Sequence, residues 1–228
     1  MIHALIFDFD GLIIDTETPA FESWREIFAE HGHDLTLTMW EDALGRGTGV
    51  GFDALEHLAA AVGDTFDREA TLARRTSRKH ELSVAQPLLP GVKSMLEQAQ
   101  TLGLPCAVAS SSGREWVEGW LRRHAIYDAF TCVRTADDVV ATKPAPDLFL
   151  SAAACLAVSP GACLVFEDSP NGIRAARAAG MRVVAVPGAI TAQLSMPPAD
   201  LVLPTLDALP LAEILTMVEP PRHQDTKV

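Results

Sequence analysis

Two acidic residues directly follow the first apolar segment of the chain. Asp8 and Asp10 come after the run at 4–7, and a spacing of two directs both carboxylates to one face of an extended strand end. Two like charges that close need a cation between them, or one must take up a proton. The pair therefore indicates a hard divalent metal such as Mg²⁺, and Gly11 permits a tight turn whose N–H groups could face an anion.

Serines follow a second apolar run, at 106–109, before a helical pattern begins. A strand-to-helix turn that carries Ser110 and Ser111 is a ready phosphate cradle, because hydroxyl and backbone N–H groups meet there. A serine at this point is equally typical of a helix N-cap. The turn by itself leaves both interpretations open.

A lysine and a second acidic pair complete the set. Lys143 precedes a proline, and the prolines at 144 and 146 restrict its direction, although a lone lysine before a helix is usually a surface residue. Glu167 and Asp168 follow the apolar run at 163–166, where Asp168 or Ser169 could cap a helix. Four carboxylates that converge would destabilise the fold unless neutralised, so we expect a bound cation and an adjacent lysine.

The elements that position these residues alternate along most of the chain. Short apolar runs at 3–7, 106–109, 130–133, 163–166 and 182–186 predict buried parallel strands. Helical periodicity lies between them, at 92–101, 115–124, 147–156 and 172–179. This alternation predicts a doubly wound, Rossmann-like α/β core, in which ligands bind at the carboxyl ends of the strands.

One interval breaks the alternation. Residues 16–86 contain only helical patterns, around 21–31, 52–62 and 67–82, which predicts an all-helical cap inserted into a core of 1–15 and 87–228. Because the cap leaves the core beside the first strand, we expect it to cover the site as a lid. Its candidate substrate contacts are Glu17, Arg46 and Thr48; the glycine-rich loop at 45–51 is equally typical of a flexible turn between helices.

Composition limits the partners. A formal net charge of −12 disfavours nucleic-acid binding, which needs many basic contacts to phosphates. The basic stretch at 74–80 is interpreted as a solvated helix face. No leader pattern opens the sequence and no run of 18 apolar residues occurs, so we expect a cytoplasmic protein without membrane contact.

Three smaller expectations concern cysteines, assembly and the final segment. The four cysteines show no metal or framework spacing, which favours buried reduced thiols. A cap free to open and close suits a monomer. Residues 220–228 are polar and begin with proline, so we expect a disordered tail.

The order of these motifs resembles that of the haloacid dehalogenase-like hydrolase superfamily. The match includes Asp8-Phe9-Asp10-Gly11, Ser110, Lys143 and Glu167-Asp168, and it spans essentially the whole core. Within the superfamily, the stretches at 7–17, 143–147 and 166–172 look like the subgroup that contains β-phosphoglucomutase and sugar-phosphate phosphatases with a helical cap. The resemblance implies a Mg²⁺-dependent phosphatase that acts on small phosphorylated metabolites.

The resemblance also implies a role for each matched residue. Asp8 would be the nucleophile that attacks phosphorus, and Asp10 the general acid and base. Mg²⁺ would be held by Asp8, by the backbone carbonyl of Asp10 and by Asp168, with Glu167 nearby or acting through water. Ser110, Ser111, Lys143 and Gly11 would bind the phosphoryl oxygens.

Two alternatives are weighed. A phosphomutase of the β-phosphoglucomutase type would carry a histidine where this chain has Ala20 and an arginine where it has Gly49, with Arg46 earlier in the loop, so mutase activity is disfavoured. A non-enzymatic receiver domain also surrounds a phosphorylated aspartate with acids, Ser or Thr and Lys. A receiver needs neither a leaving-group acid such as Asp10 nor an inserted lid.

Overall fold

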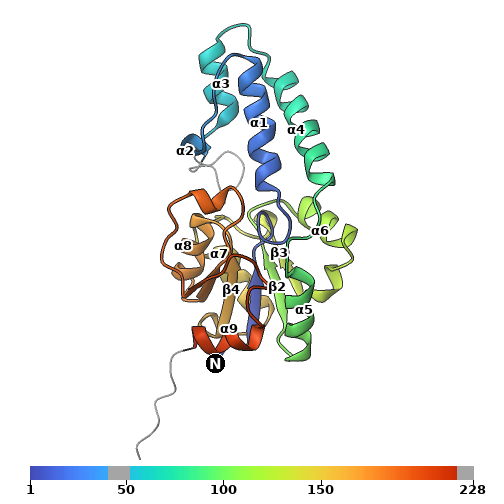
Figure 1. The fold of residues 1–228 in the computed structure, drawn as a ribbon, viewed down its shortest axis with the longest axis vertical. Coiled ribbons are helices and arrows are strands. Elements are labelled where there is room, and N and C mark those ends of the chain that lie inside the picture. Colours follow the sequence, from blue (N-terminus) through green and yellow to red (C-terminus); the bar gives the residue numbers. More distant parts are fainter. Residues whose placement is uncertain (41–51, 220–228) are drawn as a thin grey trace, which may run out of the picture.

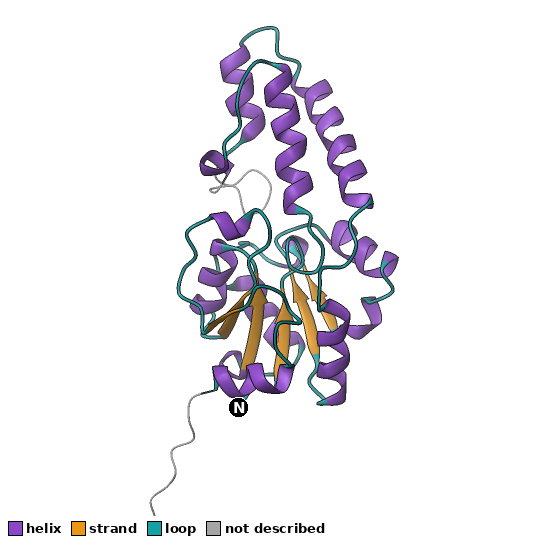
Figure 2. Ribbon diagram, viewed as in Figure 1, coloured by secondary structure: helices purple, strands orange, loops and turns teal. Residues whose placement is uncertain are grey.

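Six parallel strands form one sheet at the centre of the computed structural model, which describes residues 1–40 and 52–219 (Figures 1 and 2). The order β3-β2-β1-β4-β5-β6 places β1 between β2 and β4, so the polar residues that follow these three strands reach one edge of the sheet. The predicted doubly wound core is confirmed. The strands are β1 (Ala4–Phe7), β2 (Cys106–Ala109), β3 (Cys132–Arg134), β4 (Cys163–Glu167), β5 (Arg182–Ala185) and β6 (Leu201–Val202).

Helices cover both faces of the sheet. In β1, Leu5 and Phe7 pack into the apolar cluster on one face, while Ala4 and Ile6 pack into the cluster on the other. Both faces of the strand are therefore buried, which is why it reads as a continuous apolar run. The helices on the Leu5 side are α5 (Val92–Thr101), α6 (Arg114–Arg123) and α9 (Leu211–Val218); those on the Ala4 side are α7 (Asp147–Cys155) and α8 (Pro170–Ala178).

Between β1 and α5 the described residues form four α-helices and no strand. Figure 1 shows α1, α3 and α4 rising beyond the end of β1, above the edge where the site residues lie. Phe28 and Leu58 belong to a separate apolar cluster of this helical region, which Ile190 of the core joins. The domain bounds at 16 and 86 stay a prediction. The helices are α1 (Glu17–Glu30), α2 (Leu37–Trp40), α3 (Ala54–Val62) and α4 (Arg68–Val84).

Helices α1 and α4 pack along each other. Arg78 forms an exposed ion pair with Glu26 at 2.8 Å, and Arg74 pairs with Glu30.

Short 3₁₀ helices elsewhere lie at Tyr127–Ala129, Ala136–Asp138, Pro160–Ala162 and Thr191–Gln193. No helix among residues 1–40 and 52–219 is both long enough and apolar enough to span a membrane.

The cysteines only partly follow expectation. Cys106 and Cys163 are buried thiols, and burial raises the pKa of the Cys106 thiol to about 12. Cys132 and Cys155, in contrast, form a disulfide, so the expectation of reduced thiols is wrong for this pair. The pair is 23 residues apart in sequence, and only the packing of α7 against β3 brings the two Cα atoms to 6.7 Å.

Candidate active site

A buried acidic cluster lies at the carboxyl edge of β1 and β4. Asp8, Glu167 and Asp168 each offer a carboxylate oxygen within 4.8 Å of the others. The Lys143 ammonium contacts Asp8 Oδ1 and lies 2.6 Å from Glu167 Oε1. All four side chains are buried. The parallel pairing of β1 with β4 sets Phe7 opposite Phe166, so the residues that follow, Asp8 and Glu167, lie side by side.

The charges within this cluster are unbalanced. Burial raises the pKa of Asp8 well above its usual range, and the charge of Glu167 raises it further against the opposing effect of Lys143. Burial and the charge of Glu167 likewise raise the pKa of Asp168. Burial lowers the pKa of Lys143, but Asp8 and Glu167 outweigh it and hold the ammonium charged. Three carboxylates around one ammonium leave an excess of negative charge, so the all-oxygen donor set fits a hard divalent cation.

Glu167 is fixed by contacts to both of its carboxylate oxygens. While Oε1 accepts from Lys143, Oε2 accepts from the backbone N–H of Ser169 at 2.8 Å and from its hydroxyl at 3.0 Å. A Cβ on Gly172 would overlap the same carboxylate, so only glycine allows the first turn of α8 to lie this close. This arrangement leaves Glu167 suited to orient Lys143.

Asp168 faces the turn that follows β1. Thr191 donates from Oγ1 to Asp168 Oδ2 at 3.2 Å. Gly11 adopts a φ of +85°, and a Cβ there would overlap Asp168 Oδ2. The turn after Asp10 therefore approaches the acidic cluster through a glycine that no other residue can replace without displacing a carboxylate.

Asp10 accepts four hydrogen bonds from the part of the chain that the structure describes, two on each carboxylate oxygen. Ser110 and Ser112 donate to Oδ2 at 3.1 and 2.7 Å, while Thr16 and the indole Nε1 of Trp116 donate to Oδ1 at 2.7 and 3.0 Å. The Asp10 side chain is thus held by the turn after β2, by the start of α6 and by the residue before α1. Its carboxylate is not part of the acidic cluster found among the described residues.

The remaining predicted residues have mixed outcomes. Ser111 lies half-buried in the same turn as Ser110. Glu17 is the first residue of α1, and burial followed by the charge of Asp10 raises its pKa to about 8. Arg46 and Thr48 lie outside the described residues.

Some contacts at the site had no separate prediction. Ser112 belongs to the serine run and Ser169 was considered as a helix cap, which it is, accepting from Gly172 N at 3.1 Å. Thr16 lies in the matched stretch at 7–17, where no role was assigned to it. Trp116 and Thr191 carried no signal, because only tertiary packing brings them to the carboxylates.

The basic stretch on α4 is not wholly a solvated face, which corrects one expectation. Arg74 and Arg78 are exposed, but Arg75 and Lys79 lie on the face turned toward α1 and the core. The Arg75 guanidinium is 5.4 Å from the ring centroid of Trp24, and the Lys79 ammonium is 4.5 Å from that of Trp116. The i, i+4 spacing separates the two faces, and α1 and α6 cover the second one.

The fold and the site at the carboxyl edge of the sheet define a class of protein: a doubly wound α/β enzyme whose site residues follow the ends of neighbouring strands. Residues 5–186 match the family model described as haloacid dehalogenase-like hydrolase.

Relatives of known name agree over nearly the full length. The chain is 43% identical to the candidate phosphatase YhcW of Bacillus subtilis (strain 168), covering 94% of this chain and 97% of that protein. It is 32% identical to hexitol phosphatase B of Escherichia coli (strain K12), covering 82% and 84%. The crystal structure of a CbbY mutant from Rhodobacter sphaeroides in complex with xylulose-(1,5)bisphosphate superposes with a TM-score of 0.73 at 27% identity, covering 93% and 98%.

The chain therefore belongs to the haloacid dehalogenase-like hydrolase family. Within that family it is a phosphoric monoester hydrolase.

Proposed function

We propose that this enzyme is a Mg²⁺-dependent phosphatase that releases phosphate from small phosphorylated metabolites, sugar phosphates foremost, through an aspartyl phosphate on Asp8. The observation that carries the proposal is the contact of Lys143 with Asp8 inside a buried cluster of three carboxylates. Such a cluster suits phosphoryl transfer, which depends on positioning and on neutralising oxygen charge.

Asp8 acts as the nucleophile. Attack on phosphorus needs an ionised carboxylate, whereas burial raises the Asp8 pKa. The ammonium of Lys143 favours the ionised form, and it also lies where it can neutralise a transferring phosphoryl oxygen. Glu167 orients Lys143 and is itself held by Ser169.

The cation would be held by Asp8, by the backbone carbonyl of Asp10 and by Asp168, with Glu167 nearby. A bound Mg²⁺ supplies positive charge that neutralises phosphoryl oxygens and favours the ionised carboxylates. Thr191 and Gly11 support Asp168, since one donates to its Oδ2 and the other leaves room for it.

Asp10 acts as general acid and then as general base. As acid it gives a proton to the leaving ester oxygen while the P–O bond breaks and the Asp8–P bond forms. As base it takes a proton from the water that attacks phosphorus, which frees Asp8 and inorganic phosphate. The donors on Asp10 from Ser110, Ser112, Thr16 and Trp116 hold its carboxylate in one orientation, which both steps require.

The substrate class is inferred from relatives and from Glu17. One relative is named hexitol phosphatase B, and a CbbY mutant was crystallised in complex with xylulose-(1,5)bisphosphate; hexitols and xylulose are both polyhydroxylated. Glu17 begins α1 close to Asp10 and has a pKa raised to about 8, so near neutral pH it keeps a proton and can both donate to and accept from a sugar hydroxyl. We also propose Arg46 and Thr48 as substrate contacts.

Phosphate release from a panel of sugar phosphates, nucleotides and phosphoglycolate tests the proposal, with Mg²⁺ or EDTA, on the wild type and on Asp8→Asn. We expect turnover that needs Mg²⁺ and falls by at least about 10³-fold in Asp8→Asn, because the nucleophile is lost. Asp64→Asn, an exposed acid outside the site, serves as the matched control and should keep wild-type activity.

Activity that survives Asp8→Asn or EDTA would contradict the proposal. Phosphorus NMR on a hexose 1-phosphate separates hydrolysis from the phosphomutase alternative. A phosphatase yields free phosphate, whereas a mutase yields the 6-phosphate with little phosphate released.

A further inference from the structure

The side chain of Trp116 contacts both Asp10 and the helical region. Trp116 lies in the first turn of α6, and its indole Nε1 donates to Asp10 Oδ1 at 3.0 Å. The ammonium of Lys79 lies 4.5 Å from the centroid of the same ring. A single side chain of the core thus contacts the candidate acid and base through its N–H and a helix of the helical region through its face.

Lys79 has little else to hold it. Among the described residues it takes part in no hydrogen bond and no ion pair, although Asp10, Glu17 and Arg75 are close enough to influence its charge. An ammonium placed over an indole face is attracted by the ring quadrupole, and the attraction grows when the pair is removed from water. Lys79 is half-buried, and the Trp116 indole is the ring over which its ammonium lies.

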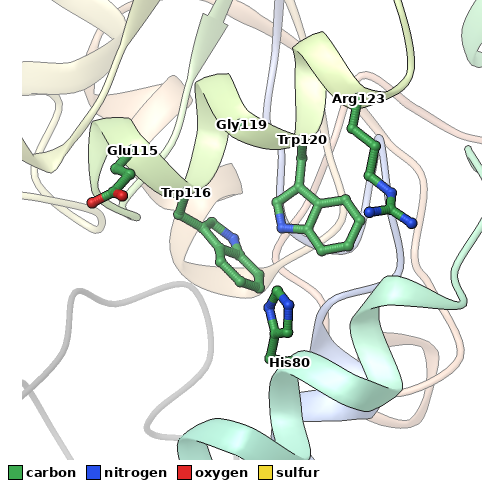
Figure 3. Close-up of a pocket in the computed structure, with 6 residues that line it drawn as sticks. All are labelled: His80, Glu115, Trp116, Gly119, Trp120 and Arg123. Atoms are coloured by element: carbon green, nitrogen blue, oxygen red, sulfur yellow. The ribbon is translucent and has the colours of Figure 1, made fainter.

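The ring of Trp116 is only partly enclosed by the core: it packs against the apolar cluster on one side and borders a cavity on the other. A cavity of about 430 Å³ lies between α4 and α6, lined in part by His80, Trp116, Trp120 and Arg123 (Figure 3). Figure 3 shows His80 reaching from α4 toward the indoles of Trp116 and Trp120. The two indoles meet edge to face at 5.6 Å between centroids. Because the cavity leaves one side of the ring without close packing, the Lys79 contact and the bond to Asp10 add to the contacts with Trp120 and the core in setting its orientation.

We propose that Trp116 is a positioning residue for Asp10, and that Lys79 links the orientation of the Trp116 indole to the position of the helical region. With α4 packed against the core, Lys79 holds the indole so that its N–H sets the direction of the Asp10 carboxylate. When α4 moves away, the ring loses this contact and Asp10 loses the Trp116 donor on its Oδ1. The inference rests on the proposed role of Asp10. It adds that the orientation of Trp116 depends on the position of the helical region.

Indole resonances test the contact without any activity. The protein has four tryptophans, and the Nε1–H peak of Trp116 is identified by its loss in Trp116→Phe. We expect Asp10→Ala and Lys79→Met each to shift that peak, while the Trp40 peak stays in place and reports that the fold is intact. An unmoved Trp116 peak in Asp10→Ala would overturn the proposal.

Leaving-group dependence tests the positioning role. An alkyl phosphate needs the proton of Asp10 to leave, whereas p-nitrophenyl phosphate releases a weakly basic phenolate that does not. We therefore expect Trp116→Phe to lower kcat/KM for the best alkyl phosphate of the panel about 10- to 100-fold, and that for p-nitrophenyl phosphate less than about 3-fold. Lys79→Met should show the same selectivity to a smaller degree, and Lys79→Arg should restore it.

Trp120→Phe is the matched control, since it removes a neighbouring indole of α6 that has no contact with Asp10. It should leave both substrates within about 2-fold of the wild type. Equal losses for both substrates in Trp116→Phe would mean a merely structural role and would overturn the proposal. If the wild type released no phosphate from any substrate, the proposed function would fail, while the resonance experiment would still decide the contact.

Discussion

At the scale of single residues, the site combines buried ionisable groups, and the pKa of each depends on the charges of the others. Lys143 lies between Asp8 and Glu167 with almost no exposure, and neither carboxylate has solvent to replace it. Replacing Lys143 by an uncharged residue would leave uncompensated buried carboxylates, which is costlier than losing a surface ion pair. Glu17 belongs to the same electrostatic group, because the charge of Asp10 helps to raise its pKa.

Glu17→Gln should change how stability depends on pH. The Glu17 pKa rises from its ordinary 4.5 to about 8 in the folded protein, so the folded state keeps a proton that the unfolded state loses. This contribution to stability is complete below about pH 4.5 and is lost as the pH rises through about 8. Urea unfolding in EDTA at pH 6 and pH 9 should show the variant gaining stability over the wild type at the higher pH. Parallel pH curves for the two proteins would contradict this.

At the scale of elements, the N-terminus of α8 caps a helix and supports the site with one side chain. Ser169 Oγ accepts from Gly172 N at 3.1 Å and donates to Glu167 Oε2 at 3.0 Å. The cap therefore cannot be lost without also loosening the carboxylate that orients Lys143.

Ser169→Ala should reduce both stability and turnover. Loss of the cap costs about 1 kcal/mol, and loss of a hydrogen bond to a buried carboxylate adds about 1–3 kcal/mol. Asp53→Ala removes only the cap of α3, where Asp53 accepts from Glu56 N at 3.1 Å, and should cost about 1 kcal/mol without loss of kcat. Ser169→Thr should restore both properties. Urea unfolding and kcat measured together check this, and an unchanged kcat in Ser169→Ala would contradict the link.

At the scale of the whole molecule, the fold gathers negative charge from distant segments at one edge. Asp8 and Asp168 lie 160 positions apart by their numbers, yet adjacent strands bring them within the same buried cluster. The net charge of −12 offers no general compensation. A bound cation would therefore stabilise the folded state directly, since the unfolded chain no longer gathers these ligands.

Mg²⁺ should raise the melting temperature of the wild type and not that of Asp168→Asn. At about 100 times Kd, binding adds about 2.7 kcal/mol, equivalent to about 5–10 °C for a chain of this size. In EDTA, Asp168→Asn should be at least as stable as the wild type, because Asn removes a carboxylate whose pKa burial and Glu167 raise. Thermal melts with Mg²⁺ or EDTA test both signs. A Mg²⁺ response that persists in Asp168→Asn would place the cation elsewhere.

Much of this protein could be predicted from its sequence. Asp8, Ser110, Lys143 and Asp168 each follow or precede an element whose apolar pattern is clear, and parallel strands necessarily end at one edge. The range at 92–101 agrees with α5 because its periodicity and flanking glycines leave little choice. Strand β6 was missed, since two residues are too short for any periodic pattern.

Local patterns in sequence determined the fold class and the residues at the strand ends, because burial on two faces and turn chemistry act over a few residues. Tertiary structure alone decided the rest. It joined Cys132 to Cys155, brought the Lys79 ammonium over the ring of Trp116, and placed that indole on Asp10. Such contacts depend on how whole helices pack against one another, and neither residue type nor spacing records that packing.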